Sequence, residues 1–374
     1  NVDNVYADMR FQQGQGYTDA PSSGLEQQII GMDYLIEAVR MEPGQDFYYL
    51  NLGRTLMNIT DIRRQDPNTQ VGQAKPDARV VDLLRLGSPS EVQQFVIQRS
   101  PLELLSYAQA VLERARELNP LNKDHYANLA RLHSFWYSRM ERDPAQIQQA
   151  IDWYKRAHDE IAPQDVVIMN EYAGAYALLG NDAQSRQDDA AAQAAFAQAQ
   201  QLLDASKQLD PRYPDTDSRL AELLRIQGRA AEATDRYVEL LSKNPHALDA
   251  QINGIIEGLR DEPEQLKRLG EVYSSATTAK PDDAPLFSVL GLISIRTGDL
   301  PRAADSYGRL TQLQPNNMEA RRNYTLVLSD TGQYQKAADQ AQAMLQLAQQ
   351  QQLPEQQTAA IQGLIDFLKV RAGG

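Results

Sequence analysis

Apolar residues recur three or four positions apart along most of the chain, which is the spacing of one face of an α-helix. Helix starts are marked as well. Ser88-Pro89-Ser90-Glu91 and Ser100-Pro101-Leu102-Glu103 each combine a capping box with a proline in the first helical turn. No segment of useful length alternates apolar and polar residues with the period of two that a β-strand requires. The pattern therefore predicts an all-α protein.

Prolines follow these helical patterns at a nearly constant interval. Pro211, Pro245, Pro281 and Pro315 are separated by 34, 36 and 34 residues. This is the length of a unit made of two antiparallel helices and two short turns. Proline suits such a boundary because it cannot donate a hydrogen bond into a helix and disfavours helical geometry in the preceding residue. The interval predicts a repeat protein.

Two of the units carry similar residues in the same order. In each of them small residues alternate with large ones, so that the large side chains of one helix can approach the backbone of the next. We expect the glycine between the two helices to take the left-handed conformation that ends the first helix. The corresponding positions are Asp217, Leu220, Ala221, Leu224, Gly228, Ala233, Tyr237, Leu240 and Pro245 in one unit, and Phe287, Leu290, Gly291, Ser294, Gly298, Ala303, Tyr307, Leu310 and Pro315 in the other.

This order resembles the tetratricopeptide repeat (TPR), whose pattern has an aromatic residue, Leu-Gly, Tyr, Gly, Ala, Phe, Ala and Pro. Partial matches recur at Tyr49, Leu52, Gly53 and Leu56; at Tyr126, Leu129 and Ala130; at Tyr172, Ala173, Tyr176 and Gly180; and at Tyr324, Leu328, Gly332 and Ala337. The resemblance implies an all-α, right-handed TPR-type solenoid of about seven to eight helical hairpins with a C-terminal capping helix.

Departures from the regular interval divide the chain into segments. Near the C-terminus, Ile361, Leu364, Ile365 and Leu368 share one helix face, as is typical of a helix that caps a solenoid. We expect an N-terminal arm or first helix at 1–24, a TPR-like unit at 25–60, an insertion loop with a short helix at 61–87, a TPR-like solenoid at 88–353, and a capping helix with a tail at 354–374.

Composition excludes several classes of partner. The 374 residues include 37 Lys and Arg against 50 Asp and Glu, a formal net charge of −13, which argues against nucleic acid. The chain has no cysteine, so disulfides and thiolate metal sites are excluded. No stretch approaches the roughly 18 apolar residues of a membrane span, so we expect no membrane insertion by this chain. It starts with Asn1 and no secretory apolar region follows, which suggests a processed chain or a fragment.

Catalytic and metal-binding motifs are not found. His125 and His133 are two helical turns apart, too far to share a metal, and there is no HExxH motif. The sequence also lacks a GxSxG motif, a phosphate-binding loop and a glycine-rich dinucleotide turn. We therefore expect no enzymatic activity, no catalytic residue, no cofactor and no metal site.

The TPR resemblance indicates which residues of each first helix would face a concave groove. They are Arg54, Asn58, Arg131, Asn170, Arg225, Ile256, Leu292, Ile295, Arg296, Arg322 and Leu326. The arginines would make the groove locally positive and could bind carboxylates of a partner. The apolar members could bury side chains of an amphipathic or extended peptide. The alternative is that packing between repeats uses these residues.

The N-terminal segment carries apolar residues with no preceding unit to pack on. These are Val2, Val5, Tyr6, Met9 and Phe11, spaced mainly three or four apart. The segment either folds back as the first helix or docks on another copy of the chain. Head-to-tail contact between the two ends of a solenoid would be a heterologous interface, which propagates into a filament if rotation does not close a ring.

Two further signals concern location. Asn58-Ile59-Thr60 and Asn323-Tyr324-Thr325 are N-glycosylation sequons, although both fall inside expected helices and are also expected by chance. Residues 46–53 and 115–130 resemble the soluble repeat region that follows the membrane helices of some bacterial O-antigen ligase-like envelope proteins. That resemblance implies an outward-facing, envelope-associated protein, without ligase chemistry, which resides in membrane segments that this chain lacks.

Together these features predict a non-enzymatic, extracellular or envelope-associated TPR scaffold that associates with copies of itself, head to tail into a filament or a ring. The alternative is a monomeric adaptor that binds a peptide or an envelope protein in its concave groove.

Overall fold

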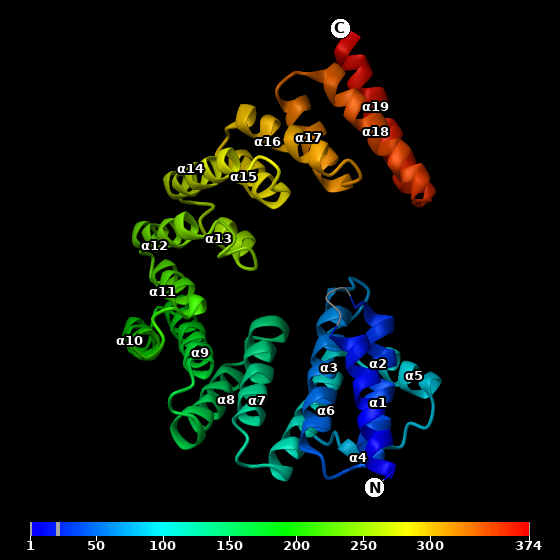
Figure 1. The fold of residues 1–374 in the computed structure, drawn as a ribbon, viewed down its shortest axis with the longest axis vertical. Helices are drawn as coiled ribbons and strands as arrows, with labels where there is room; N and C mark the ends of the chain where they lie inside the picture. Colours follow the sequence, from blue (N-terminus) through cyan, green and yellow to red (C-terminus); the bar gives the residue numbers. More distant parts are fainter. Residues whose placement is uncertain (1, 20–22, 374) are drawn as a thin grey trace. The chain divides into compact units, whose positions relative to one another are not determined.

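Helices make up all of the regular secondary structure in the part of the chain that the structure describes (Figure 1). The computed structural model describes residues 2–19 and 23–373; for Val2 and Asp3 it gives the backbone only. The chain divides into two compact units, Asn1–Tyr213 and Pro214–Gly374. The prediction of an all-α fold is confirmed.

The first unit runs from α1 to α10. Its helices are α1 Val2–Thr18, α2 Leu25–Met41, α3 Asp46–Gln65, α4 Val80–Leu84, α5 Pro89–Gln98, α6 Pro101–Leu118, α7 Lys123–Phe135, η1 Trp136–Met140, α8 Pro144–Lys155, η2 Arg156–Ile161, α9 Val166–Ser185 and α10 Asp189–Leu209, where η marks a π-helical segment.

Within this unit each helix packs on a neighbour in a regular succession. Helix α1 packs on α2, α2 on α3, α3 on α6, and the pairing continues through α7, α8, α9 and α10. Between α3 and α6 the chain leaves the stack, and the short helices α4 and α5 pack against α2. This excursion is anchored where the Leu102 amide donates to the Val71 carbonyl and the Lys75 amide donates to Ser106 Oγ, at 3.1 and 2.9 Å.

Both predicted capping boxes start helices. Ser88 accepts a hydrogen bond from the Glu91 amide at the start of α5, and Ser100 accepts one from the Glu103 amide at the start of α6. At Ser100 the box is reciprocal, because the Glu103 carboxylate also accepts from the Ser100 amide. Each box satisfies amides that would otherwise lack a partner at a helix N-terminus.

The second unit contains the most regular repeats. Its helices are α11 Pro214–Ile226, α12 Ala230–Lys243, α13 Ile252–Gly258, α14 Pro263–Ala279, α15 Ala284–Arg296, α16 Leu300–Leu313, α17 Met318–Asp330, α18 Tyr334–Gln350 and α19 Glu355–Gly373. Here too helices pack on their neighbours along the chain, except that α12 packs on α14 rather than on the short helix α13, and α19 lies against α18 as the expected capping helix.

Glycines make the turns and the close contacts of these repeats. Gly228, Gly298 and Gly332 end α11, α15 and α17 with φ of 75°, 76° and 74°, as predicted from the sequence. Inside α15, a Cβ on Gly291 would lie 2.8 Å from the ring of Tyr307 in α16. Only a residue without a side chain lets the ring approach this closely.

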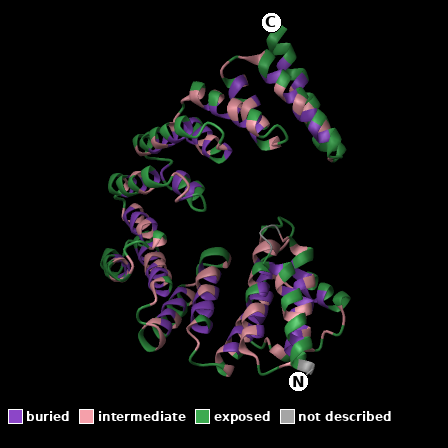
Figure 2. Ribbon diagram, in the orientation of Figure 1, coloured by how far each residue is buried: buried purple, intermediate pink, exposed green. Residues whose placement is uncertain are grey.

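The core follows the faces where helices meet. Figure 2 shows buried residues along these faces and exposed residues along the opposite ones. Large side chains such as Leu52, Tyr107, Tyr237 and Tyr273 are almost completely buried. An amphipathic hairpin therefore buries its apolar face only against the next one, which is the physical basis of a repeat stack.

Candidate functional site

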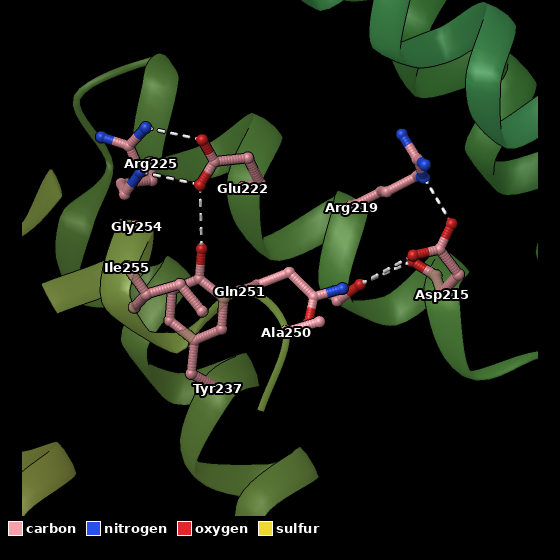
Figure 3. A pocket seen from close by; sticks show the side chains of 10 residues that line it. Asp215, Arg219, Glu222, Arg225, Tyr237, Ala250, Gln251, Gly254 and Ile255 are labelled. Atoms are coloured by element: carbon pink, nitrogen blue, oxygen red, sulfur yellow. Dashed lines mark hydrogen bonds and ion pairs between the residues drawn. The ribbon is translucent and has the colours of Figure 1, made fainter. Parts of the chain in front are cut away.

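An open pocket of about 500 Å³ lies in the second unit, between α11 and α13 (Figure 3). It adjoins the face of α11 on which the sequence places Arg225, and Tyr237 of α12 contributes to its wall. The lining residues are Asp215, Ser218, Arg219, Glu222, Arg225, Tyr237, Ala250, Gln251, Gly254 and Ile255.

The charged residues of this pocket are paired with one another. Arg225 donates from Nε and Nη2 to the two carboxylate oxygens of Glu222, at 2.8 and 2.6 Å, and this bonding raises the pKa of Arg225. The Tyr237 hydroxyl donates to the same carboxylate at 3.2 Å. Arg219 donates from Nε to Asp215 at 2.6 Å. The pocket therefore offers both signs of charge, and Arg225 can bind a partner's carboxylate only in competition with Glu222.

Arg131 in the first unit is engaged in a similar way. Its Nε and Nη2 donate to the carboxylate of Glu171 at 2.9–3.1 Å, joining α7 to α9. This two-point geometry suits a guanidinium and a carboxylate and holds the two helices in register. Of the predicted groove arginines, Arg131 and Arg225 therefore have most of their charge neutralised by carboxylates of this chain, Glu171 and Glu222.

Several predicted groove residues are placed in the packing between helices. Asn170 is completely buried and its amide donates to the Val166 carbonyl and to Ser206 Oγ, both at 2.7 Å. Ile256 is 1% exposed, and Leu292 packs against the same hydrophobic core. Asn170 and Ile256 are therefore not surface residues of a groove, because helix contacts cover them.

The remaining predicted groove residues reach the surface. Arg54 and Asn58 are exposed on α3, and Arg322 is exposed on α17. Arg296 forms an ion pair with Glu257 at 3.3 Å. The two apolar members, Ile295 and Leu326, are 37% and 44% exposed. Of the sequon residues, Asn58 is exposed and Asn323 is half-buried, each within a helix.

The N-terminal segment forms helix α1 and packs on α2. A Cβ on Gly31 of α2 would lie 2.9 Å from the Gly14 carbonyl oxygen, so the two backbones cross in close contact. Phe11 packs edge-on against Phe47 and at a tilt against Tyr48, in both cases with 5.0 Å between ring centroids. Of the other predicted arm residues, the side chain of Val2 lies outside the described part, and the exposed fractions are 68% for Val5, 53% for Tyr6 and 43% for Met9.

Helix α19 exposes a second apolar surface that the sequence analysis missed. Ile365 and Leu368 are buried against α18, whereas Phe367 and Val370 are 52% and 76% exposed. Gly363 lies next to them with nothing within 4 Å of a Cβ position, so this face is open. The signal was present in the sequence, since 363, 367 and 370 follow the spacing of one helix face.

The histidines are dispersed in the structure. His125 Nε2 lies 2.6 Å from Asp46 Oδ2, and His133 Nδ1 lies 2.8 Å from Gln146 Oε1. Among the residues that the structure describes, no three His, Asp or Glu side chains are grouped to hold a metal ion. Over the same residues, no helix combines the length and apolar character needed to cross a membrane.

Comparison with solved structures identifies the fold. Yeast Tom70 aligns over 98% of this chain with a TM-score of 0.51 and 14% identity; the chain spans 64% of the length of Tom70. A TPR protein from Parabacteroides merdae aligns over 87% of this chain and 99% of its own, with 15% identity and a TM-score of 0.43. A thermophilic TPR protein from Thermus thermophilus aligns over 63% and 94%, with 18% identity and a TM-score of 0.35.

The fold is an α-solenoid of the TPR type, as the sequence pattern predicted. No protein-family model and no curated protein matches the sequence.

Proposed function

We propose that this chain is a non-enzymatic scaffold for protein–protein interaction, and that its copies associate head to tail through helices α1 and α19. The observation that supports this proposal most strongly is the exposure of apolar side chains on these two helices. Val5, Tyr6 and Met9 on α1, and Phe367 and Val370 on α19, are each between 43% and 76% exposed.

Along each unit, most apolar residues at helical spacing are covered by a neighbouring helix of the stack, although single apolar side chains such as Ile97 and Leu209 are exposed. The outer faces of α1 and α19 carry the same kind of residue but are uncovered within this chain. A helix from a second copy fits this requirement, since the two helices have similar lengths of 17 and 19 residues. Burying a large apolar side chain contributes roughly 1.5–3 kcal/mol, so a few such residues can support association.

The cysteine-free chain allows a direct test of this contact. We would prepare the single variants Met9→Cys and Val370→Cys, mix them in equal amounts and add a flexible bismaleimide. Head-to-tail association predicts a cross-linked dimer in the mixture and much less in either variant alone. The matched control replaces Val370→Cys by Lys336→Cys, an exposed position on α18. Equal cross-linking in the control mixture would argue against the proposed interface.

A second candidate function is that of an adaptor that binds a peptide in its groove as a monomer. The pocket of about 500 Å³ beside α11 favours it, because Gln251 offers hydrogen bonds beside the apolar Ile255. A partner's carboxylate could also compete for Arg225 with Glu222. Binding of an acidic peptide array, compared between the native chain and Arg225→Glu, would test it. Loss of binding in the variant supports the adaptor, and an array without any bound peptide contradicts it.

An extracellular or envelope location completes the proposal. It is supported by the resemblance of residues 46–53 and 115–130 to envelope proteins and by the exposed sequon at Asn58. Fractionation of the source cells with an antibody against the chain would test it, and recovery only in the cytoplasmic fraction would contradict it.

A further inference from the structure

One repeat of the second unit begins without a helix. After Pro281 and Pro315 the chain soon enters α15 and α17, each of 13 residues. After Pro245 it makes a series of turns over residues 245–251, and the following helix α13 has only 7 residues. The turns are held by short-range bonds such as that from the Gln251 amide to the Leu248 carbonyl at 2.9 Å. We call residues 245–251 the turn segment.

His246 ties the turn segment to the next repeat. Its Nδ1 lies 2.9 Å from Asp249 Oδ2, within the turn segment, and its Nε2 lies 2.8 Å from Asp283 Oδ2, at the start of α15. Both ring nitrogens can donate only in the imidazolium form, because neutral imidazole carries a single N–H. The arrangement therefore matches a protonated histidine between two carboxylates.

The Asp283 side chain does not cap its own helix. It occupies the N-cap position of α15, where an aspartate normally accepts a hydrogen bond from the helix amides, but its side chain makes no such bond. At the equivalent positions of the next two helices, Asp299 caps α16 and Asn317 caps α17. The Asp283 carboxylate thus has two competing partners, the imidazolium of His246 and the Leu286 amide of its own helix, which here donates to the Asp283 carbonyl at 3.2 Å. Pro285 lies between them and has no N–H to offer.

The other charged groups near Asp283 and the turn segment are paired with one another, so they do not compete with His246 for the Asp283 carboxylate. Asp282, beside Asp283, is ion-paired with Arg309 at 2.7 Å. On α12, which precedes the turn segment, Lys243 and Glu239 pair with each other at 2.6 Å.

On α14 the titratable group near Asp249 is Tyr273, whose hydroxyl is buried and whose pKa is raised by burial and then by Asp249. This phenol stays neutral near neutral pH, so it adds no competing charge. The charged groups that face the imidazole are therefore Asp249 and Asp283.

We propose that His246 and Asp283 form a proton-controlled clasp between two successive helical pairs. With the imidazolium present, Asp283 holds the turn segment. With neutral imidazole, Asp283 moves to cap α15 and the turn segment is released. The clasp requires no particular partner of the chain. Its opening would change the pocket beside α11, because Ala250 and Gln251 of the turn segment line the pocket wall.

The direction of the pH dependence follows from the bonding. The hydrogen bond with Asp283, and then that with Asp249, raises the pKa of His246 above its ordinary value. The clasp is therefore fully closed below about pH 6.5, the ordinary pKa of histidine, and opens as the pH rises through the raised pKa. The imidazole side chain is 31% exposed, so solvent protons reach it.

Hydrogen exchange of the whole chain tests the clasp, with rates corrected for the intrinsic effect of pH. Between pH 6 and pH 9 we expect protection of the turn segment to fall by about fivefold, the effect of one charge pair, while protection of the first turn of α15 rises. His246→Lys should keep the turn segment protected at both values, and His246→Gln should leave it unprotected at both.

Asp283→Asn separates the clasp from a general effect of pH, because asparagine caps helices as well as aspartate but carries no charge. This variant should lose the pH dependence and keep α15 protected. His158→Gln, at a histidine of the first unit that contacts Asp159, is the matched control and should behave like the native chain. Equal protection of the turn segment at both pH values, or an unchanged pH response in Asp283→Asn, would overturn the proposal.

Discussion

The close approach of α16 to α15 can be tested by adding one methyl group, in the variant Gly291→Ala. A Cβ at this position would lie 2.8, 2.9 and 3.1 Å from three atoms of the Tyr307 ring. Tyr307 is only 2% exposed, so surrounding residues limit its movement. Forcing an extra carbon into such a site costs about 1–3 kcal/mol. Alanine regains about 1 kcal/mol over glycine in a helix, which leaves a net loss of about 1 kcal/mol.

Native-state hydrogen exchange of α15 and α16 is the suitable assay, because a repeat protein need not unfold in one step. We expect Gly291→Ala to lower the opening free energy of these helices. The control is Gly363→Ala in α19, where nothing lies within 4 Å of the added carbon and alanine should stabilise by up to about 1 kcal/mol. If both variants stabilise equally, the packing of Tyr307 against Gly291 is not as close as described.

Three further predictions concern the first unit. Gly31→Val should detach α1, because the space is filled by Thr18 and Gly14, and limited proteolysis of residues 4–18 would show it; unchanged cleavage would refute the crossing. Replacing Arg131 with Lys should not preserve the bidentate bond with Glu171 and should lower the opening free energy of α7 and α9 by about 1 kcal/mol in native-state hydrogen exchange; unchanged protection of these helices would contradict this. Burial lowers the pKa of His133, so stability is complete above about pH 6.5, the ordinary histidine pKa, and falls as the pH drops toward the lowered pKa. Because His133 stacks on Trp136, tryptophan fluorescence should report this loss, and a flat profile between pH 7 and 5 would exclude it.

Features set by local sequence could be predicted. The left-handed glycines Gly228 and Gly298, the side-chain cap at Ser88 and the capping box at Ser100 depend on residues within one turn, and the structure confirms them. At Ser88 the box is not reciprocal, because the Glu91 carboxylate accepts from the Gly87 amide instead. The pairing of Arg225 with Glu222 is also local, three residues apart on one helix face. It could have been read from the sequence, because such pairs are neighbours on a helix.

Features set by distant contacts could not be predicted. The turn segment depends on an aspartate 37 residues further along the chain. The bond between Arg131 and Glu171 spans 40 residues. The contact between Gly14 and Gly31 could not be predicted either. It depends on how two helices cross, and the residues around Gly14 are polar and do not indicate a helix contact.

Static light scattering measures the molar mass of the purified native chain in solution, and this mass decides whether copies of the scaffold associate with one another. We expect the mass to exceed the 41.9 kDa of one chain and to rise with protein concentration at neutral pH. A mass that stays at 41.9 kDa up to high concentration would contradict it.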